Sequence, residues 1–109
     1  MATITLTDNG DWFAVQGNHK TSILSFNALG NFGGGSLVGT TTQWNDLTRA
    51  VTFRDGGGTQ VEITQETQFG ISTTAKDRWY IFTLQGSTGA SVDIDYTGNG
   101  VSIIKTNKL

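Results

Sequence analysis

The residues of this chain that could perform acid–base chemistry or bind a metal are nine carboxylates and one histidine, and there is no cysteine. Asp93 and Asp95 lie two positions apart in a stretch that alternates like a β-strand, so their side chains are expected on one face, about 7 Å apart. That spacing allows a carboxylate pair or a calcium site, although solvated charge on an outer face is the favoured interpretation. Glu62 and Glu66 are likewise predicted to share the outer face of a strand. His19 lies in a polar stretch typical of a hairpin turn, so no catalytic residue and no metal site is predicted.

The segment GNFGGG, residues 30–35, has the glycine content of a phosphate-binding loop but not the required spacing. A P-loop needs a lysine after its last glycine, and a dinucleotide-binding loop needs glycines that open a helix. Here Ser36 follows directly, and the next residues are β-branched and strand-like. We therefore predict a turn with positive φ angles, where the chain passes close to another backbone segment, and no cofactor. Phe32, inside this turn, is predicted either to fold back over the end of the domain or to contact a partner.

The composition narrows the class of protein. A chain of 109 residues with 15 glycines, 10% aromatic residues and 15% charged residues suits one all-β domain rather than a disordered chain. The net charge of −2 and the absence of a basic run argue against nucleic-acid binding. No apolar run approaches the ~20 residues of a membrane span, and the N-terminus lacks a signal-peptide pattern. We expect a soluble protein that is made in the cytoplasm.

Short alternating stretches recur along the chain and are separated by turn residues, as in a β-sandwich or barrel. We predict one domain over residues 1–109, an antiparallel β-sandwich that is jelly-roll-like. A hairpin at Asn9-Gly10 is predicted between the first two strands, and residues 43–50 could hold one helical turn. The predicted strands are 2–6, 11–15, 21–27, 36–42, 50–53, 59–64, 69–73, 78–84, 91–96 and 101–105.

Two of these strands, 11–15 and 78–84, are apolar on both faces. In a two-layer sandwich only one face of a strand looks into the core. The second apolar face is therefore predicted either to be covered by a loop or a chain end, or to form a contact with a subunit or partner. The sequence leaves both possibilities open.

The tryptophans raise the possibility of sugar binding, because exposed aromatic rings can stack on pyranose rings. Trp12 and Trp79 are predicted in strands, in the core or an interface. Trp44, in the polar stretch TTTQWNDLT, is the one expected to be exposed.

Two glycine-rich segments, LSFNALGNFGGGSL and WYIFTLQGSTGASVDIDY, stand out when read together. The first contains the pattern G-x-F-G-G-G-[ST]-[VL] from Gly30 to Leu37. The second contains Y-x-F-x-L-x-G-[AS]-T-G-A-S-V-x-[VI] from Tyr80 to Ile94. These segments, about half of the chain, resemble small bacteriophage virion structural proteins of the capsid decoration, or cement, type. The resemblance implies a small sandwich or jelly-roll protein that decorates a capsid, and it implies no catalytic residues.

The expectation from the sequence is thus a non-enzymatic viral structural protein that binds the major capsid protein and stabilises the shell. Copies of the chain are possible partners of one another; nucleic acid and membranes are not expected partners. The expected location is the virion surface, after assembly in the host cytoplasm. The alternative is a carbohydrate-binding module, or a tail or fibre accessory protein involved in host attachment. The predicted contact residues are Trp12, Phe13, Phe32, Trp44, Tyr80 and Phe82.

Overall fold

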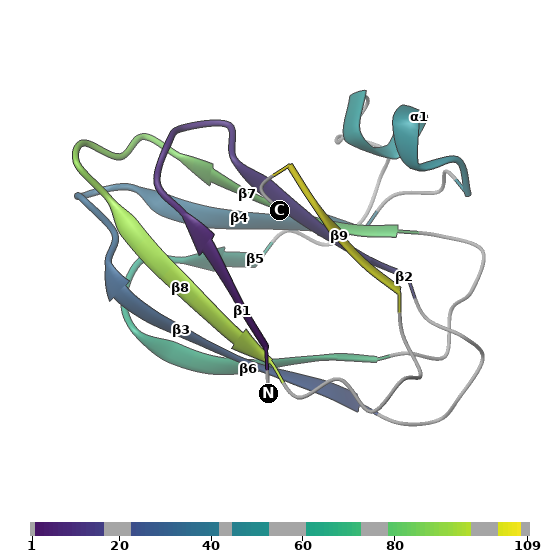
Figure 1. Ribbon diagram of the computed structural model, residues 1–109, viewed down its shortest axis with the longest axis horizontal. Helices are drawn as coiled ribbons and strands as arrows, with labels where there is room; N and C mark the ends of the chain where they lie inside the picture. Colours follow the sequence, from purple (N-terminus) through teal and green to yellow (C-terminus); the bar gives the residue numbers. More distant parts are fainter. Residues whose placement is uncertain are drawn as a thin grey trace.

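The computed structural model describes residues 2–16, 23–41, 45–52, 61–72, 79–96 and 103–107, and its strands form two packed sheets (Figure 1). The sheets have the orders β1-β8-β3-β6 and β5-β4-β7-β2-β9, and all neighbouring strands are antiparallel. The four-stranded sheet consists of β1 (Ala2–Leu6), β8 (Ser91–Tyr96), β3 (Ile23–Asn31) and β6 (Thr67–Ser72). The five-stranded sheet consists of β5 (Val61–Ile63), β4 (Ser36–Thr41), β7 (Trp79–Gln85), β2 (Trp12–Gln16) and β9 (Ile103–Thr106).

The strand pairs are nested within one another. Strand β4 pairs with β5, β3 with β6, β2 with β7, and β1 with β8. This is the pairing of one long two-stranded ribbon folded over on itself, with β9 added to the edge of β2. The predicted antiparallel β-sandwich is confirmed. The finer assignment as a jelly roll stays a prediction.

Four connections, β1–β2, β3–β4, β5–β6 and β7–β8, cross from one sheet to the other at the same end of the sandwich (Figure 1). The predicted Asn9-Gly10 hairpin is therefore wrong, because β1 and β2 lie in different sheets. Gly10 does have a positive φ of 94°. The prediction of a turn at Asn9-Gly10 is therefore confirmed, but the turn connects strands of two different sheets instead of two paired strands.

Residues 47–52 form a short helix, α1 (Leu47–Thr52), where a strand was predicted for 50–53. Asp46 starts the helix, because its Oδ1 accepts a hydrogen bond from Thr48 N at 3.0 Å and its carbonyl accepts one from Ala50 N. The predicted helical turn in 43–50 is present, but it begins later and extends further.

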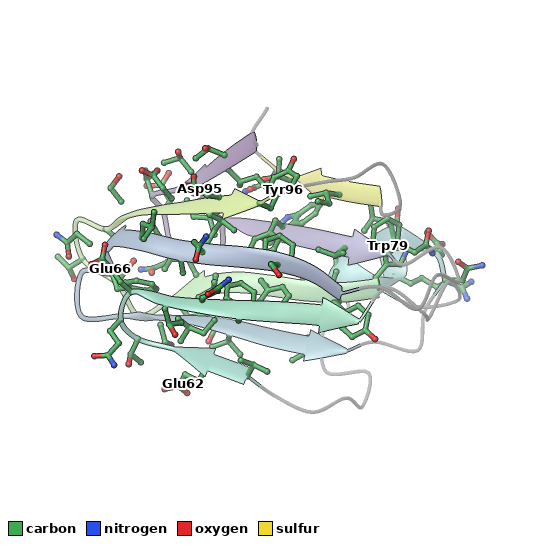
Figure 2. The ribbon with its side chains drawn as sticks, turned by 90° about the horizontal axis from the view of Figure 1, so that it is seen from below. Glu62, Glu66, Trp79, Asp95 and Tyr96 are labelled. Atoms are coloured by element: carbon green, nitrogen blue, oxygen red, sulfur yellow. The ribbon has the colours of Figure 1, made fainter. Side chains whose placement is uncertain are left out.

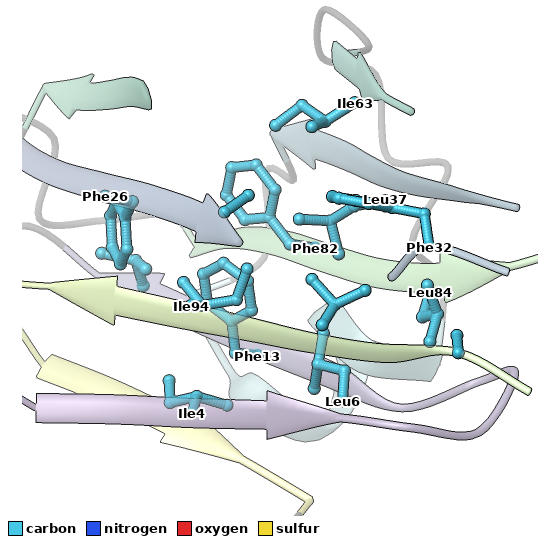
Figure 3. Close-up of a cluster of buried hydrophobic side chains, with 14 residues drawn as sticks. Ile4, Leu6, Phe13, Phe26, Phe32, Leu37, Ile63, Phe82, Leu84 and Ile94 are labelled. Atoms are coloured by element: carbon cyan, nitrogen blue, oxygen red, sulfur yellow. The ribbon is translucent and has the colours of Figure 1, made fainter. Parts of the chain in front are cut away.

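The core is centred on four phenylalanine rings that form a closed cycle between the sheets, and Figure 3 shows Phe13, Phe26 and Phe82 of this cycle. The ring centroid of Phe13 lies 4.8 Å from that of Phe82 and 5.5 Å from that of Phe26. Phe69 closes the cycle, because its ring centroid lies 5.2 Å from that of Phe26 and 5.4 Å from that of Phe82. These separations fall in the range that aromatic pairs prefer. Gly39 on β4 makes room for this cluster, because a Cβ there would lie 2.5 Å from Cε2 of Phe82.

Replacing Phe13 by alanine is expected to lower the free energy of unfolding by about 3–5 kcal/mol, because it opens a cavity between the two sheets. The matched control is Val61→Ala, since Val61 is 44% exposed; it should change the free energy by less than about 0.5 kcal/mol. Urea unfolding followed by tryptophan fluorescence measures both variants. A loss below about 1 kcal/mol for Phe13→Ala would contradict the central place of this ring.

Candidate functional site

Three of the six predicted contact residues are core residues. Phe13, Phe32 and Phe82 have exposed fractions of 0%, 5% and 4%. All three pack in the main core cluster, so the expectation that they present surface to a partner is corrected. For Phe32 the structure selects one of the two alternatives: the ring folds back into the end of the sandwich.

Two of the other predicted contact residues, Tyr80 and Trp12, lie on opposite sides of one sheet. Tyr80 is half-buried against the main core, and Trp12 is half-buried against a second apolar cluster on the opposite side of its sheet. Trp44 and His19 lie outside the described residues. The five described members of the predicted set therefore do not share one exposed surface.

The second apolar face of β2 and β7 is covered by helix α1. Ala50 of the helix packs in one cluster with Trp79, Ile81 and Ala14 of the sheet, flanked by Leu47, Val51 and Trp12. Trp79 Nε1 donates a hydrogen bond to the carbonyl of Asn45 at 2.9 Å, just before the helix. The second apolar face of β2 and β7 was predicted either to be covered by the chain itself or to contact a partner. In the described part of the molecule, helix α1 of the same chain covers it.

No described helix or strand covers the outer face of the other sheet, β1-β8-β3-β6, and we call it the open face. Along β3 the exposed positions Ser25, Asn27 and Leu29 alternate with the buried positions Phe26 and Ala28. The same alternation holds along β1 and β8. The described residues that present side chains on the open face are Thr3, Thr5, Ser25, Asn27, Leu29, Asn31, Gln68, Ser91, Asp93 and Asp95.

Side chains of the open face form rows across the strands. Thr3, Asp95, Asn27 and Gln68 are successive register partners on the four strands. Thr3 Oγ1 donates to Asp95 Oδ1 at 2.7 Å, and one row away Thr5 Oγ1 donates to Asp93 Oδ1 at 2.8 Å. These hydrogen bonds orient the two carboxylates on the open face.

The carboxylates are dispersed over the molecule. Glu62 lies on β5, Glu66 at the loop end of the sandwich, and Asp95 on the open face (Figure 2). The prediction that Glu62 and Glu66 share a strand face is wrong, because β5 ends at Ile63; Glu66 Oε2 accepts a hydrogen bond from Gly30 N at 2.9 Å. Among the described residues no group of three or more His, Cys, Asp or Glu side chains could hold a metal ion.

The loops at the crossing end form one interlocked unit. Asn9 exchanges hydrogen bonds with Ser87: its Nδ2 donates to the Ser87 carbonyl at 3.0 Å, and its Oδ1 accepts from Ser87 N and Oγ at 2.8 and 2.7 Å. Thr88 N donates to the carbonyl of Gly33 at 2.9 Å. The buried Asp11 accepts from Thr7 N and Asp8 N at 3.0 and 2.9 Å. The end of the sandwich is thereby held in one arrangement.

The glycine segment 30–35 behaves as predicted from its sequence. Gly30, Gly33 and Gly34 have φ angles of 105°, 60° and 76°. A Cβ on Gly35 would meet the carbonyl of Gln85, and one on Gly33 would meet that of Thr88. The segment is a turn packed on another backbone, and β3 runs on to Asn31 rather than ending at Asn27.

No family model, no curated protein and no solved structure matches this chain. Within the described ranges, no helix is both long and apolar enough to cross a membrane. The open face is the candidate functional surface among the described residues.

Substitution of Gly33 and Gly34 by alanine separates backbone strain from close packing within one turn. Both glycines have positive φ, which costs about 1–2 kcal/mol for alanine. Only at Gly33 does the added Cβ meet another backbone segment, whereas Gly34 has nothing within 4 Å. Gly33→Ala should therefore lower the free energy of unfolding by about 1–3 kcal/mol more than Gly34→Ala. Urea unfolding measures both variants. Equal losses of unfolding free energy would contradict this prediction and show that the backbone of the β7–β8 loop moves away from the added Cβ without cost.

Proposed function

We propose that this chain is a non-enzymatic structural protein of a bacteriophage virion, a decoration protein that docks on the major capsid protein and stabilises the shell. The observation that carries the proposal is the difference between the two outer faces. Helix α1 covers the apolar part of one face, whereas the other face is an open four-stranded sheet. An open, ordered sheet face is suited to docking on a flat protein surface.

The side chains of the open face support a docking role rather than catalysis. They are mostly short hydroxyl and amide groups, which lose little rotamer entropy when they are covered. Leu29, 39% exposed, lies next to Asp93 in the register and supplies an apolar centre within a polar surround. The threonine–aspartate bonds further reduce the ordering cost of binding.

The strand connectivity also supports a viral structural role. We interpret the nested pairs, from β4–β5 outward to β1–β8, as a jelly roll. Jelly rolls build viral capsid proteins and lectins. The glycine-turn resemblance favours the former, since those turns are the segments shared with small phage structural proteins.

The alternative is carbohydrate binding, alone or within a tail or fibre accessory protein. A sugar-binding sheet face needs aromatic rings on which pyranoses stack. The open face carries none among its described residues. The structure therefore gives this alternative less support than the capsid role.

The direct test is co-sedimentation of the purified protein with emptied or expanded capsids of the phage that encodes it. Wild-type protein should bind saturably. Leu29→Arg, which places a large charge on the open face, should weaken binding by at least about tenfold, a typical loss at the centre of an interface.

The matched control is Thr48→Arg, which adds the same side chain on the exposed side of α1. It should bind like wild type. Absence of wild-type binding would overturn the decoration role. Retained binding by Leu29→Arg with loss in Thr48→Arg would overturn the choice of face. Saturable quenching of tryptophan fluorescence by sugars, abolished in Trp44→Ala, would favour the carbohydrate alternative.

A further inference from the structure

The two sheets differ in how their edge strands are protected against pairing with another chain. The edges of the five-stranded sheet are short: β5 has three residues and includes Glu62, and β9 has four and includes Lys105. Short length and charge are devices that keep an edge strand from pairing. The edges of the four-stranded sheet, β1 and β6, have five and six residues and contain neither charge nor proline. Among the described strands, β1 and β6 of the four-stranded sheet are therefore the edge strands best able to pair with a strand of another chain.

Of these two edge strands, β1 is better suited to pair with a strand of another chain. Strand β6 contains Gly70 in its interior, which weakens strand pairing, and Glu66 lies just before it. Strand β1 is ATITL, with β-branched residues at its three central positions. Within the described part of the chain, β1 pairs only with β8 and its other edge has no strand partner.

The sequence of β1 is also complementary to itself. It reads Thr-Ile-Thr about a centre at Ile4. In an antiparallel pair of two such strands centred on Ile4, Thr3 of one lies opposite Thr5 of the other. Threonine pairs across strands are favourable, and both threonines are exposed on the same face. Ile4 would meet Ile4 on the inner face, where it is already buried.

We propose that β1 pairs antiparallel with β1 of a second copy, in the register Thr3 opposite Thr5 of the partner subunit. The pair is isologous, so it closes as a dimer rather than growing into a filament. It joins two four-stranded sheets into one continuous sheet of eight strands. The two-fold axis then runs perpendicular to the sheet, and both open faces look in the same direction. The proposal rests on the edges alone and does not depend on the capsid role.

Cysteine cross-linking tests both the pairing and its register, since the natural chain has no cysteine. Thr3→Cys and Thr5→Cys are made as separate single variants of the full chain. Residues directly opposite in an antiparallel pair have Cα atoms about 4.5–5.5 Å apart, within reach of a disulfide. Each variant alone places its two cysteines on a diagonal, two residues apart along the strands and about 7–8 Å apart, which is beyond the usual reach of a disulfide. Mild oxidation should therefore cross-link the mixture of the two variants, but neither variant alone.

The control for random collision is Asn27→Cys, on the same open face but in the interior strand β3. Mixed with Thr3→Cys, it should give no covalent dimer above background. Circular dichroism checks that each variant is folded. Sedimentation of the wild-type chain should show the apparent mass rising toward twice the monomer between micromolar and millimolar concentration.

Two results would overturn the proposed dimer. Cross-linking of Thr3→Cys with itself would show another register. A mass that stays monomeric at every concentration, without cross-linking of the mixture, would show that β1 does not pair with a second copy. If Thr3→Lys then abolished capsid binding of such a monomer, the edge of β1 would be a contact with the capsid protein and not with a second copy of this chain. Absence of capsid binding together with a cross-linked mixture would overturn the proposed function and leave the dimer standing.

Discussion

The closed cycle of four phenylalanine rings is the contact on which the rest of the fold depends. Phe13 and Phe82 are direct register partners on β2 and β7, and Phe26 and Phe69 are direct partners on β3 and β6. Each sheet thus contributes one cross-strand pair, and the two pairs meet in the core. A slip of one residue in either strand pair would turn a ring to the outer face and break the cycle. The rings therefore couple the register of one sheet to that of the other, which hydrogen bonding within a sheet cannot do.

Alternation of side chains predicted much of the secondary structure and of the inward faces. Asp93 and Asp95 share one face as predicted, and the strand that begins at Trp79 has apolar side chains on both faces as predicted, because period-2 patterning is a local property. Strand partners are not local. Asn9-Gly10 fits a hairpin turn, yet Asn9 bonds to Ser87 of another loop, and Gly10 N donates to the carbonyl of Leu84. Those contacts, 70 to 80 positions away in the chain, decide that the turn bridges two sheets.

The candidate site was less predictable than the fold, and the reason is physical. Large apolar residues were expected at a partner contact, but the same residues are those that a small core needs most. Phe13 and Phe82 are used in the core, and the second apolar face of their strands is used to seat α1. The surface left open is built from threonine, asparagine, glutamine and aspartate, which a sequence pattern cannot distinguish from ordinary solvated strand positions. The asymmetry between the two sheets becomes visible only when the helix is seen on one of them.

The size of the open face connects the two proposals. Four strands about 4.8 Å apart and between five and nine residues long, at about 3.4 Å per residue, cover an area of a few hundred Å². A stable interface buries about 800 Å² on each partner, so one open face is small for a contact that must persist on a virion. Pairing across β1 would place two such faces side by side on one surface, because Thr3 and Thr5 point to the open face in both copies. Once the open face of one copy had bound, the open face of the other copy would bind at a high effective concentration. The two small faces together would then bury an area closer to that of a stable interface. An unprotected strand edge is an aggregation hazard in a free protein, but under the proposed capsid role it would give a direct way to enlarge a contact that is small on its own.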